Sequence, residues 1–251
     1  MVNGIYLKKY YGHRVNGFWY PRVTSICGII SKPGLENWIA SHGSVYAMKK
    51  RRKEITEWGN AVHEKVEKIL LGKMPIIDDQ IEPSINAFLR WLKKHKVDID
   101  GVEQRVVSKK HSYSGTLDLV GKIDNDFGII DIKTSKKIWD AHFLQTAAYF
   151  QAYNERSIKK AKTHWVLRID QLQTCSLCGA EMRKKGKKPE ISGGKKKCEH
   201  QWNDVNGICE IKKVKNHEYF SDAFMTAKKL WEFSNREWLV KVKNYPRRSN
   251  I

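Results

Sequence analysis

The chain has 251 residues, of which 41% are hydrophobic and nine are tryptophan, so it can bury the core of one large domain and is not a disordered chain. Lysine and arginine number 47 against 27 aspartates and glutamates, and the net charge of +20 favours polyanionic partners, nucleic acid foremost, although a lysine-rich surface alone has the same effect. We find no signal peptide and no apolar run of about 18 residues, so we expect a cytoplasmic protein, prokaryotic or viral in a host cytoplasm, with no membrane partner; protein partners stay unknown.

The first third of the chain is predicted to be helical. A short helix opens at 21–26, and Pro33 begins a second one that runs to Ser41. The basic run 49–53 is either a solvated helix face or a phosphate contact. A strong amphipathic helix is expected over 56–71, and its stripe turns His63 inward. By itself, an inward histidine is more often a core residue than a metal ligand.

The rest of the chain alternates between strands and helices. The expected helices are 83–94, 140–154 and one that begins at Ser221 or Asp222, and the expected strands are 101–109, 113–123, 127–134, 163–169 and 208–214. The central order is therefore helix, three strands, helix, strand. This order predicts an α/β fold whose first strands are antiparallel and whose helix crosses over to the next strand.

Two neighbouring strands each carry a carboxylate in apolar surroundings. Asp118 lies between leucines, and Asp131 lies among isoleucines with Lys133 two positions later. Because side chains alternate along a strand, Asp131 and Lys133 share a face. Burying a carboxylate is costly unless it binds something, and two carboxylates with an ammonium suit metal-assisted phosphodiester cleavage. The alternative is an exposed strand, since a D-x-K triplet alone is common.

The helix expected over 140–154 carries a polar stripe on an otherwise apolar segment. His142, Gln145 and Tyr149 lie at positions i, i+3 and i+7. The stripe is either part of a functional site or an ordinary solvated face.

Four of the five cysteines come late in the chain. A C-x-x-C-G knuckle is followed, after nineteen residues, by a cysteine and a histidine, which is a usual spacing for structural zinc; the residues are Cys175, Cys178, Cys198 and His200. Cys209 is an alternative fourth ligand. Residues 183–197, between the knuckles, include eight basic residues and one acid. We therefore interpret 171–207 as a basic, zinc-binding insertion that grips a nucleic-acid backbone, or else as a flexible loop that the metal holds.

Five short motifs, in order, resemble the PD-(D/E)xK nuclease superfamily, and within it the RecB-like exonuclease domains of phage and mitochondrial relatives. They are the histidine helix Gly59–His63, the acidic Glu103 on the first strand, the strand Gly115–Asp118, the strand Asp131–Thr134 and the helix Gln145–Tyr149. The resemblance covers roughly residues 20–170 and the final strand and helix. Leu117 stands where the family name has proline, which RecB-like members often lack.

The resemblance implies a restriction-endonuclease-like core, a mixed central sheet flanked by helices in the order αβββαβ, with a small metal-binding insertion. It also implies roles for individual residues. Mg²⁺ or Mn²⁺ would be held by His63, Asp118, Asp131 and the carbonyl of Ile132. Lys133 would orient or activate the water, and Gln145 and Tyr149 would position the phosphate or the lysine. Glu103 could bind a second metal through water.

The implied activity is a metal-dependent DNA exonuclease that acts on single strands or DNA ends in recombination, repair or replication and leaves a 5′-phosphate. The alternatives are a structure-selective endonuclease on the same fold and a non-catalytic nucleic-acid-binding protein. Residues 1–170 and 208–251 would form the nuclease core, and 171–207 the insertion. Some relatives bind an iron–sulfur cluster through one early and three late cysteines. Cys27 could serve as the early one, but four ligands already lie together late, which favours zinc.

Overall fold

The computed structural model describes residues 11–30, 39 and 43–246, so the helix expected over 33–41 lies outside the described residues except for one position. The helices are α2 (Val23–Cys27), α4 (Val45–Leu70), α5 (Glu82–Leu92), α6 (Asp140–Arg156), α7 (His217–Ser234) and α8 (Arg236–Leu239). The strands are β1 (Gly12–Val15), β2 (Phe18–Pro21), β3 (Val97–Ser108), β4 (Tyr113–Ile123), β5 (Asp126–Lys133), β6 (Thr163–Thr174), β7 (Glu181–Lys184), β8 (Pro189–Ser192) and β9 (Asn206–Lys213).

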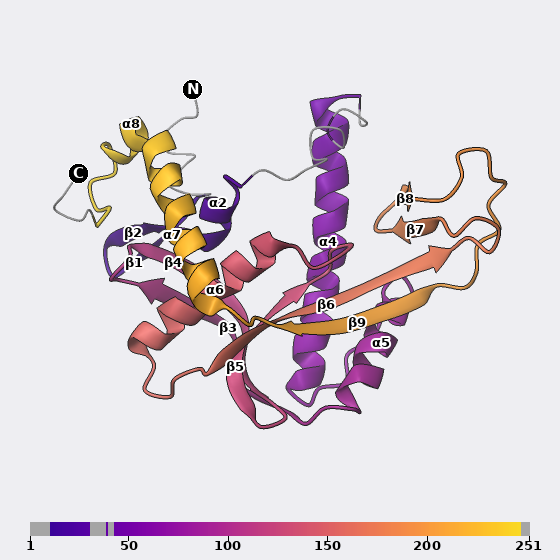
Figure 1. The fold of residues 1–251 in the computed structure, drawn as a ribbon, viewed down its shortest axis with the longest axis horizontal. Helices are drawn as coiled ribbons and strands as arrows, with labels where there is room; N and C mark the ends of the chain where they lie inside the picture. The colour runs from indigo at the N-terminus through magenta and orange to yellow at the C-terminus, as the bar shows by residue number, and fades with distance from the viewer. Residues whose placement is uncertain (1–10, 31–38, 40–42, 247–251) are drawn as a thin grey trace.

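The protein is a mixed α/β fold around one central sheet (Figure 1). The strand order is β3-β4-β5-β6-β7-β8, and β9 pairs with β6. Strands β3, β4 and β5 form an antiparallel meander, whereas β5 and β6 are parallel and α6 connects them. A parallel pair needs such a crossover, because a tight turn can join only antiparallel strands. The two carboxylate strands, β4 and β5, therefore lie near the middle of the sheet.

Helices cover both faces of the sheet, and alternation along the strands divides the core in two. Val120 and Ile129 pack with α2, α6 and α7 on one face, while Ile130 and Ile132 pack with α4 and α5 on the other. Asp131 lies between the last two in sequence, so its side chain points to the α6 face. None of the described helices is both long enough and apolar enough to cross a lipid bilayer.

Two predicted helix starts are wrong. Helix α4 begins at Val45 rather than near residue 56, because the Ser44 side chain accepts a hydrogen bond from the Ala47 amide and caps it earlier. The basic run 49–53 therefore lies inside this helix. Helix α7 begins at His217, capped by Asn216, and not at 221 or 222.

The ladder between β6 and β9 continues into the segment that was assigned to the insertion. Leu172 pairs with Asn206, and β6 runs on to Thr174, where β7 adds to its end. The hairpin of β7 and β8 lies above the far end of this long pair of strands and is turned back toward α4 (Figure 1). The insertion is thus a continuation of the sheet as well as a loop.

Candidate functional site

The two strand carboxylates meet where β4 and β5 stop pairing. Leu119 and Ile130 are the last paired residues, and Asp118 and Asp131 follow one step beyond them. The backbone amide of Ile132 donates a 2.7 Å hydrogen bond to Oδ2 of Asp118. Because both strands are held by the sheet up to this point, the two carboxylates have little freedom to separate.

Lys133 lies between these carboxylates. Its ammonium forms an ion pair with Oδ2 of Asp131, which is 1% exposed, and lies 3.3 Å from the carbonyl oxygen of Ile132. Burial raises the pKa of Asp131 to about 6, and burial also raises the pKa of Asp118. Burial acts to lower the pKa of Lys133, but the two carboxylates outweigh it and raise this pKa. Two buried carboxylates thus lie close together, and a nearby cation is needed to stabilise their charged forms.

The histidine helix reaches the same place from the other face. Nδ1 of His63 lies 3.9 Å from Oδ2 of Asp118. Burial, and then the charge of Lys133, lower the pKa of His63 to about 4, so the imidazole is neutral near pH 7 and has a lone pair to offer. Gly59 permits this approach, since a Cβ there would lie 2.9 Å from Oγ1 of Thr134.

Helix α6 brings the amide and phenol of the predicted polar stripe to Asp131. Nε2 of Gln145 lies 3.3 Å from Oδ1 of Asp131 and 3.0 Å from the hydroxyl oxygen of Tyr149. The Tyr149 ring lies over Gly115, where a Cβ would come within 2.3 Å of it. His142 points elsewhere and accepts a hydrogen bond from the backbone amide of Trp139.

Two further carboxylates flank Asp118, and sequence reasoning found only one of them. Glu103 lies at the level of Asp118 on β3, since its neighbours Val102 and Gln104 pair on either side of Asp118. Its φ of +47° marks an irregular strand position. Glu67 was missed; burial, then Glu103 and Asp118, raise its pKa to about 7. The signal was available, because Glu67 is one helical turn beyond His63.

The donor types at this site fit a hard divalent cation. They are two buried carboxylates, a neutral imidazole and the Ile132 carbonyl. The ammonium of Lys133 lies against Asp131 at this site.

The late cysteines and the histidine do form a compact cluster. The ligand atoms of Cys175, Cys178, Cys198 and His200 all lie within 4.8 Å of one another. Sγ of Cys175 is 3.9 Å from Sγ of Cys198, and Sγ of Cys178 is 3.4 Å from Nδ1 of His200. A tetrahedral zinc ion with bonds of about 2.3 Å to sulfur and about 2.0 Å to nitrogen needs separations of about 3.8 and 3.5 Å. The cluster therefore has the dimensions of a zinc site.

The thiols of this cluster perturb one another's pKa values, because they lie so close together. Burial acts to raise the pKa of Cys175, but contacts with His200 and backbone amides lower it to about 6. Burial and the neighbouring thiols raise the pKa of Cys198 to about 12. Three thiolates this close would repel one another, which adds to the effect of burial on the pKa of Cys198, and a bound divalent cation would remove that repulsion.

The remaining two cysteines lie outside the cluster. Cys209 is opposite Ile169 on β9 and packs with the hydrophobic residues under α4 and α5, so it is not placed as the alternative zinc ligand. Cys27 ends α2 and is buried in the core on the α6 face, together with Tyr149. The structure thus gathers the four late ligands without an early cysteine.

A cavity of about 880 Å³ opens elsewhere, between α4, the segment before α5, β6 and β7. Its lining includes Trp58, Gln171 and Lys184, but not the carboxylates or the lysine of the candidate site. The residues suited to catalysis therefore lie outside this cavity, which is compatible with a polymer substrate because such a substrate can bind to an open surface.

Comparisons with known proteins add little to this geometry. No protein-family model and no curated protein matches the chain. Among solved structures, the crystal structure of LHK-Exo in complex with dAMP matches with 14% sequence identity and a TM-score of 0.26, over 72% of this chain and 85% of that one. Similarity at this level is too low to assign a family or an activity.

Proposed function

We propose that this protein is a metal-dependent DNA nuclease with a PD-(D/E)xK, RecB-like core. The observation that carries the proposal is the convergence of Asp118, Asp131, Lys133 and Gln145 from two strands and the crossover helix. The order of elements along the chain, with α6 between the parallel strands β5 and β6, supports the restriction-endonuclease-like arrangement.

Each side chain has a role that follows from its surroundings. Asp118 and Asp131 concentrate negative charge, and the neutral His63 adds a nitrogen donor. Bound Mg²⁺ or Mn²⁺ would activate water and stabilise charge on the phosphate. The ammonium of Lys133 is placed to stabilise the same developing charge, and Gln145 fixes the orientation of Asp131.

We further propose that residues 1–170 and 208–251 form the nuclease core and that 171–207 form a basic, zinc-holding insertion. The ligand spacing of the late cluster supports zinc as a structural metal. The exposed lysines of the insertion then face the DNA backbone, which needs no base-specific contact. Glu103 and Glu67 are proposed to assist charge balance beside Asp118.

The activity is tested with end-labelled linear DNA in Mg²⁺. Asp131→Asn and Lys133→Met each remove a charge with little change of size, and we expect a loss of cleavage of at least about 100-fold. The control is Asp126→Asn, an exposed position at the start of the same strand, which should retain activity. Full activity in both site variants would refute the proposal, and DNA binding without cleavage in Mg²⁺ or Mn²⁺ would favour the non-catalytic alternative.

The finer proposal is an exonuclease that acts on single strands or ends. A circular single-stranded substrate distinguishes it from a structure-selective endonuclease, because an exonuclease leaves a closed circle intact. We expect degradation of the linear form to mononucleotides or short products and no cutting of the circle.

The zinc proposal has a test that does not depend on activity. Metal analysis of the purified chain should give about one zinc per chain, the content of a single four-ligand site. Cys178→Ser should lower this content, whereas Cys209→Ser should not. A zinc content near zero, or the brown colour of an iron–sulfur cluster, would overturn the assignment.

A further inference from the structure

The loop that follows the Lys133 strand is held by side chains that are distant in sequence. We call residues 134–139 the post-strand loop; its first three backbone carbonyls accept hydrogen bonds from buried cations. The ammonium of Lys185 donates to the first carbonyl, and Nη1 of Arg168 donates to the second and third at 3.4 and 2.9 Å. This loop connects Lys133 directly to α6, so its conformation sets the position of Gln145 relative to the lysine.

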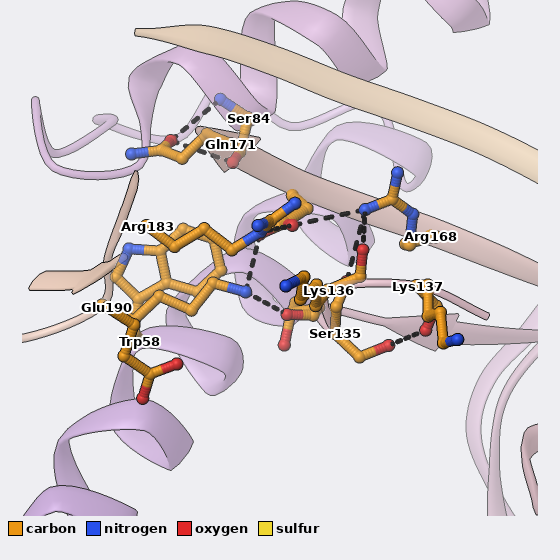
Figure 2. Close-up of polar contacts among 12 residues, drawn as sticks. Trp58, Ser84, Ser135, Lys136, Lys137, Arg168, Gln171, Arg183 and Glu190 are labelled. Carbon is orange, nitrogen blue, oxygen red and sulfur yellow. Dashed lines mark hydrogen bonds and ion pairs between the residues drawn. The ribbon is translucent and has the colours of Figure 1, made fainter. Parts of the chain in front are cut away.

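One buried carboxylate orients both cations. Asp170 is fully buried; its Oδ1 lies 2.6 Å from Nζ of Lys185, and its Oδ2 lies 3.3 Å from Arg168 and 2.9 Å from Arg183. Figure 2 labels Arg168 and Arg183, whose dashed lines run toward one another. Two carboxylates at the rim complete the charge balance, Glu210 beside Arg168 and Glu181 beside Arg183. Buried charges are retained only when they are paired in this way, and paired groups have few alternative positions.

Register connects this network to the candidate site. Arg168 is the β6 residue opposite Lys133 in the parallel pair, and Asp170 lies two positions further on the same face. The network therefore begins beside the lysine and extends toward the insertion.

Lys185 comes from the insertion but does not belong to its surface. It is 7% exposed, and its ammonium lies 4.7 Å from the centre of the Trp58 ring on α4. The guanidinium of Arg51, also on α4, donates to the carbonyl of Lys185. A side chain enclosed between α4 and the end of β5 cannot contact a DNA backbone, so its charge serves the protein itself.

On the basis of the nuclease function proposed above, we propose that Asp170, Lys185 and Arg168 are positioning residues that hold the post-strand loop and so place Lys133 and Gln145. The insertion is then a structural part of the catalytic core as well as a surface for DNA. The zinc cluster fits this role, because Cys178 and the knuckle turn lead directly into β7, which carries Arg183 and ends just before Lys185.

The test compares Lys185→Met with two controls. We expect Lys185→Met to lower kcat by about 10- to 100-fold, the effect of a displacement near 1 Å at a reacting centre. Its affinity for DNA in Ca²⁺, without cleavage, should stay unchanged. Lys122→Met removes an exposed lysine from β4, and Lys159→Met removes an exposed lysine that pairs with Asp100; neither residue contacts the three carbonyls. Both controls should keep the wild-type kcat.

Hydrogen exchange gives a readout that needs no activity. Lys185→Met should lose amide protection in the peptide that covers 134–139, and the controls should not. Asp170→Asn is the second variant, since it keeps the size of the side chain and should lose protection in the same peptide. If the wild-type chain cleaves no DNA, the nuclease proposal fails, but the exchange data still decide whether the network holds the loop. Wild-type protection and wild-type kcat in both Lys185→Met and Asp170→Asn would overturn the inference.

Discussion

At the scale of single residues, the site depends on close approaches that only small side chains permit. Gly115 and Gly59 each stand where another element touches the sheet, the first under the Tyr149 ring and the second against Thr134. In the sequence, both glycines are recognised only as parts of the motifs Gly59–His63 and Gly115–Asp118. The structure supplies the physical reason, since a Cβ at either position would push away a residue that contacts or follows the carboxylate strands.

We predict that Gly115→Ala disturbs the site through Tyr149. The added Cβ would lie 2.3 Å from the ring, and overpacking of this kind costs about 1–3 kcal/mol. For a chain of this size, the melting temperature should fall by about 2–4 °C per kcal/mol, with a loss of kcat as Gln145 shifts. A double-mutant cycle with Tyr149→Leu provides the control. On that background the alanine should cost little, and full additivity would contradict the argument.

At the scale of elements, the sequence predicted those helices and strands that have a local pattern, and it did not predict features that depend on contacts with distant segments. The alternation and apolar runs around Asp118 and Asp131 predicted β4 and β5, and Pro83 predicted the start of α5, because each of these signals is local. The start of α4 was missed because its first turns carry basic residues that hide the period. Arg51 in that run is neither solvated nor free for phosphate; it is 6% exposed and bonds to the insertion.

Strand β6 carries a buried histidine that should make stability depend on pH. Both ring nitrogens of His164 lack a hydrogen-bond partner among the described residues, and its ring lies 4.9 Å from that of Phe150. Burial, then the neighbouring His217, lower the pKa of His164 to about 3. As the pH falls below about 6.5, the unfolded chain binds this proton before the folded chain does. The contribution of the neutral His164 to stability is therefore fully present above about pH 6.5, and it is lost progressively as the pH falls toward the folded pKa of about 3.

His164→Phe should remove this contribution. We expect the free energy of unfolding of the wild type to fall more steeply than that of the variant between pH 6 and 4, by up to about 1.4 kcal/mol per pH unit. Urea denaturation at a series of pH values measures the difference. Other groups with shifted pKa values, such as Asp131, are common to both chains and cancel. Parallel curves for the two proteins would show that the pKa of His164 is the same in the folded and the unfolded chain.

At the scale of the whole molecule, the contacts that join distant segments were beyond the reach of the sequence. Lys185 and Thr134 meet across the sheet, and nothing in the run Arg183–Lys188 distinguishes the buried Lys185 from its exposed neighbours Lys184 and Lys187. Composition suggested a uniformly basic insertion. In the fold, its charges divide into buried ones that pair with Asp170 and exposed ones that face solvent.

The exposed part of that charge should govern the salt dependence of DNA binding. Lys195, Lys196 and Lys197 are all exposed, and each phosphate contact releases a counterion. Each phosphate contact contributes about 0.7 to the slope of log affinity against log salt on single strands and about 0.9 on duplex DNA. Changing all three lysines to glutamine should therefore reduce the magnitude of this slope by about 2 to 3. A matched triple at Lys229, Lys241 and Lys243 removes the same charge from exposed positions on and after α7. Equal slopes for the two triples, measured in Ca²⁺, would mean that DNA responds to the net charge of +20 and not to the insertion.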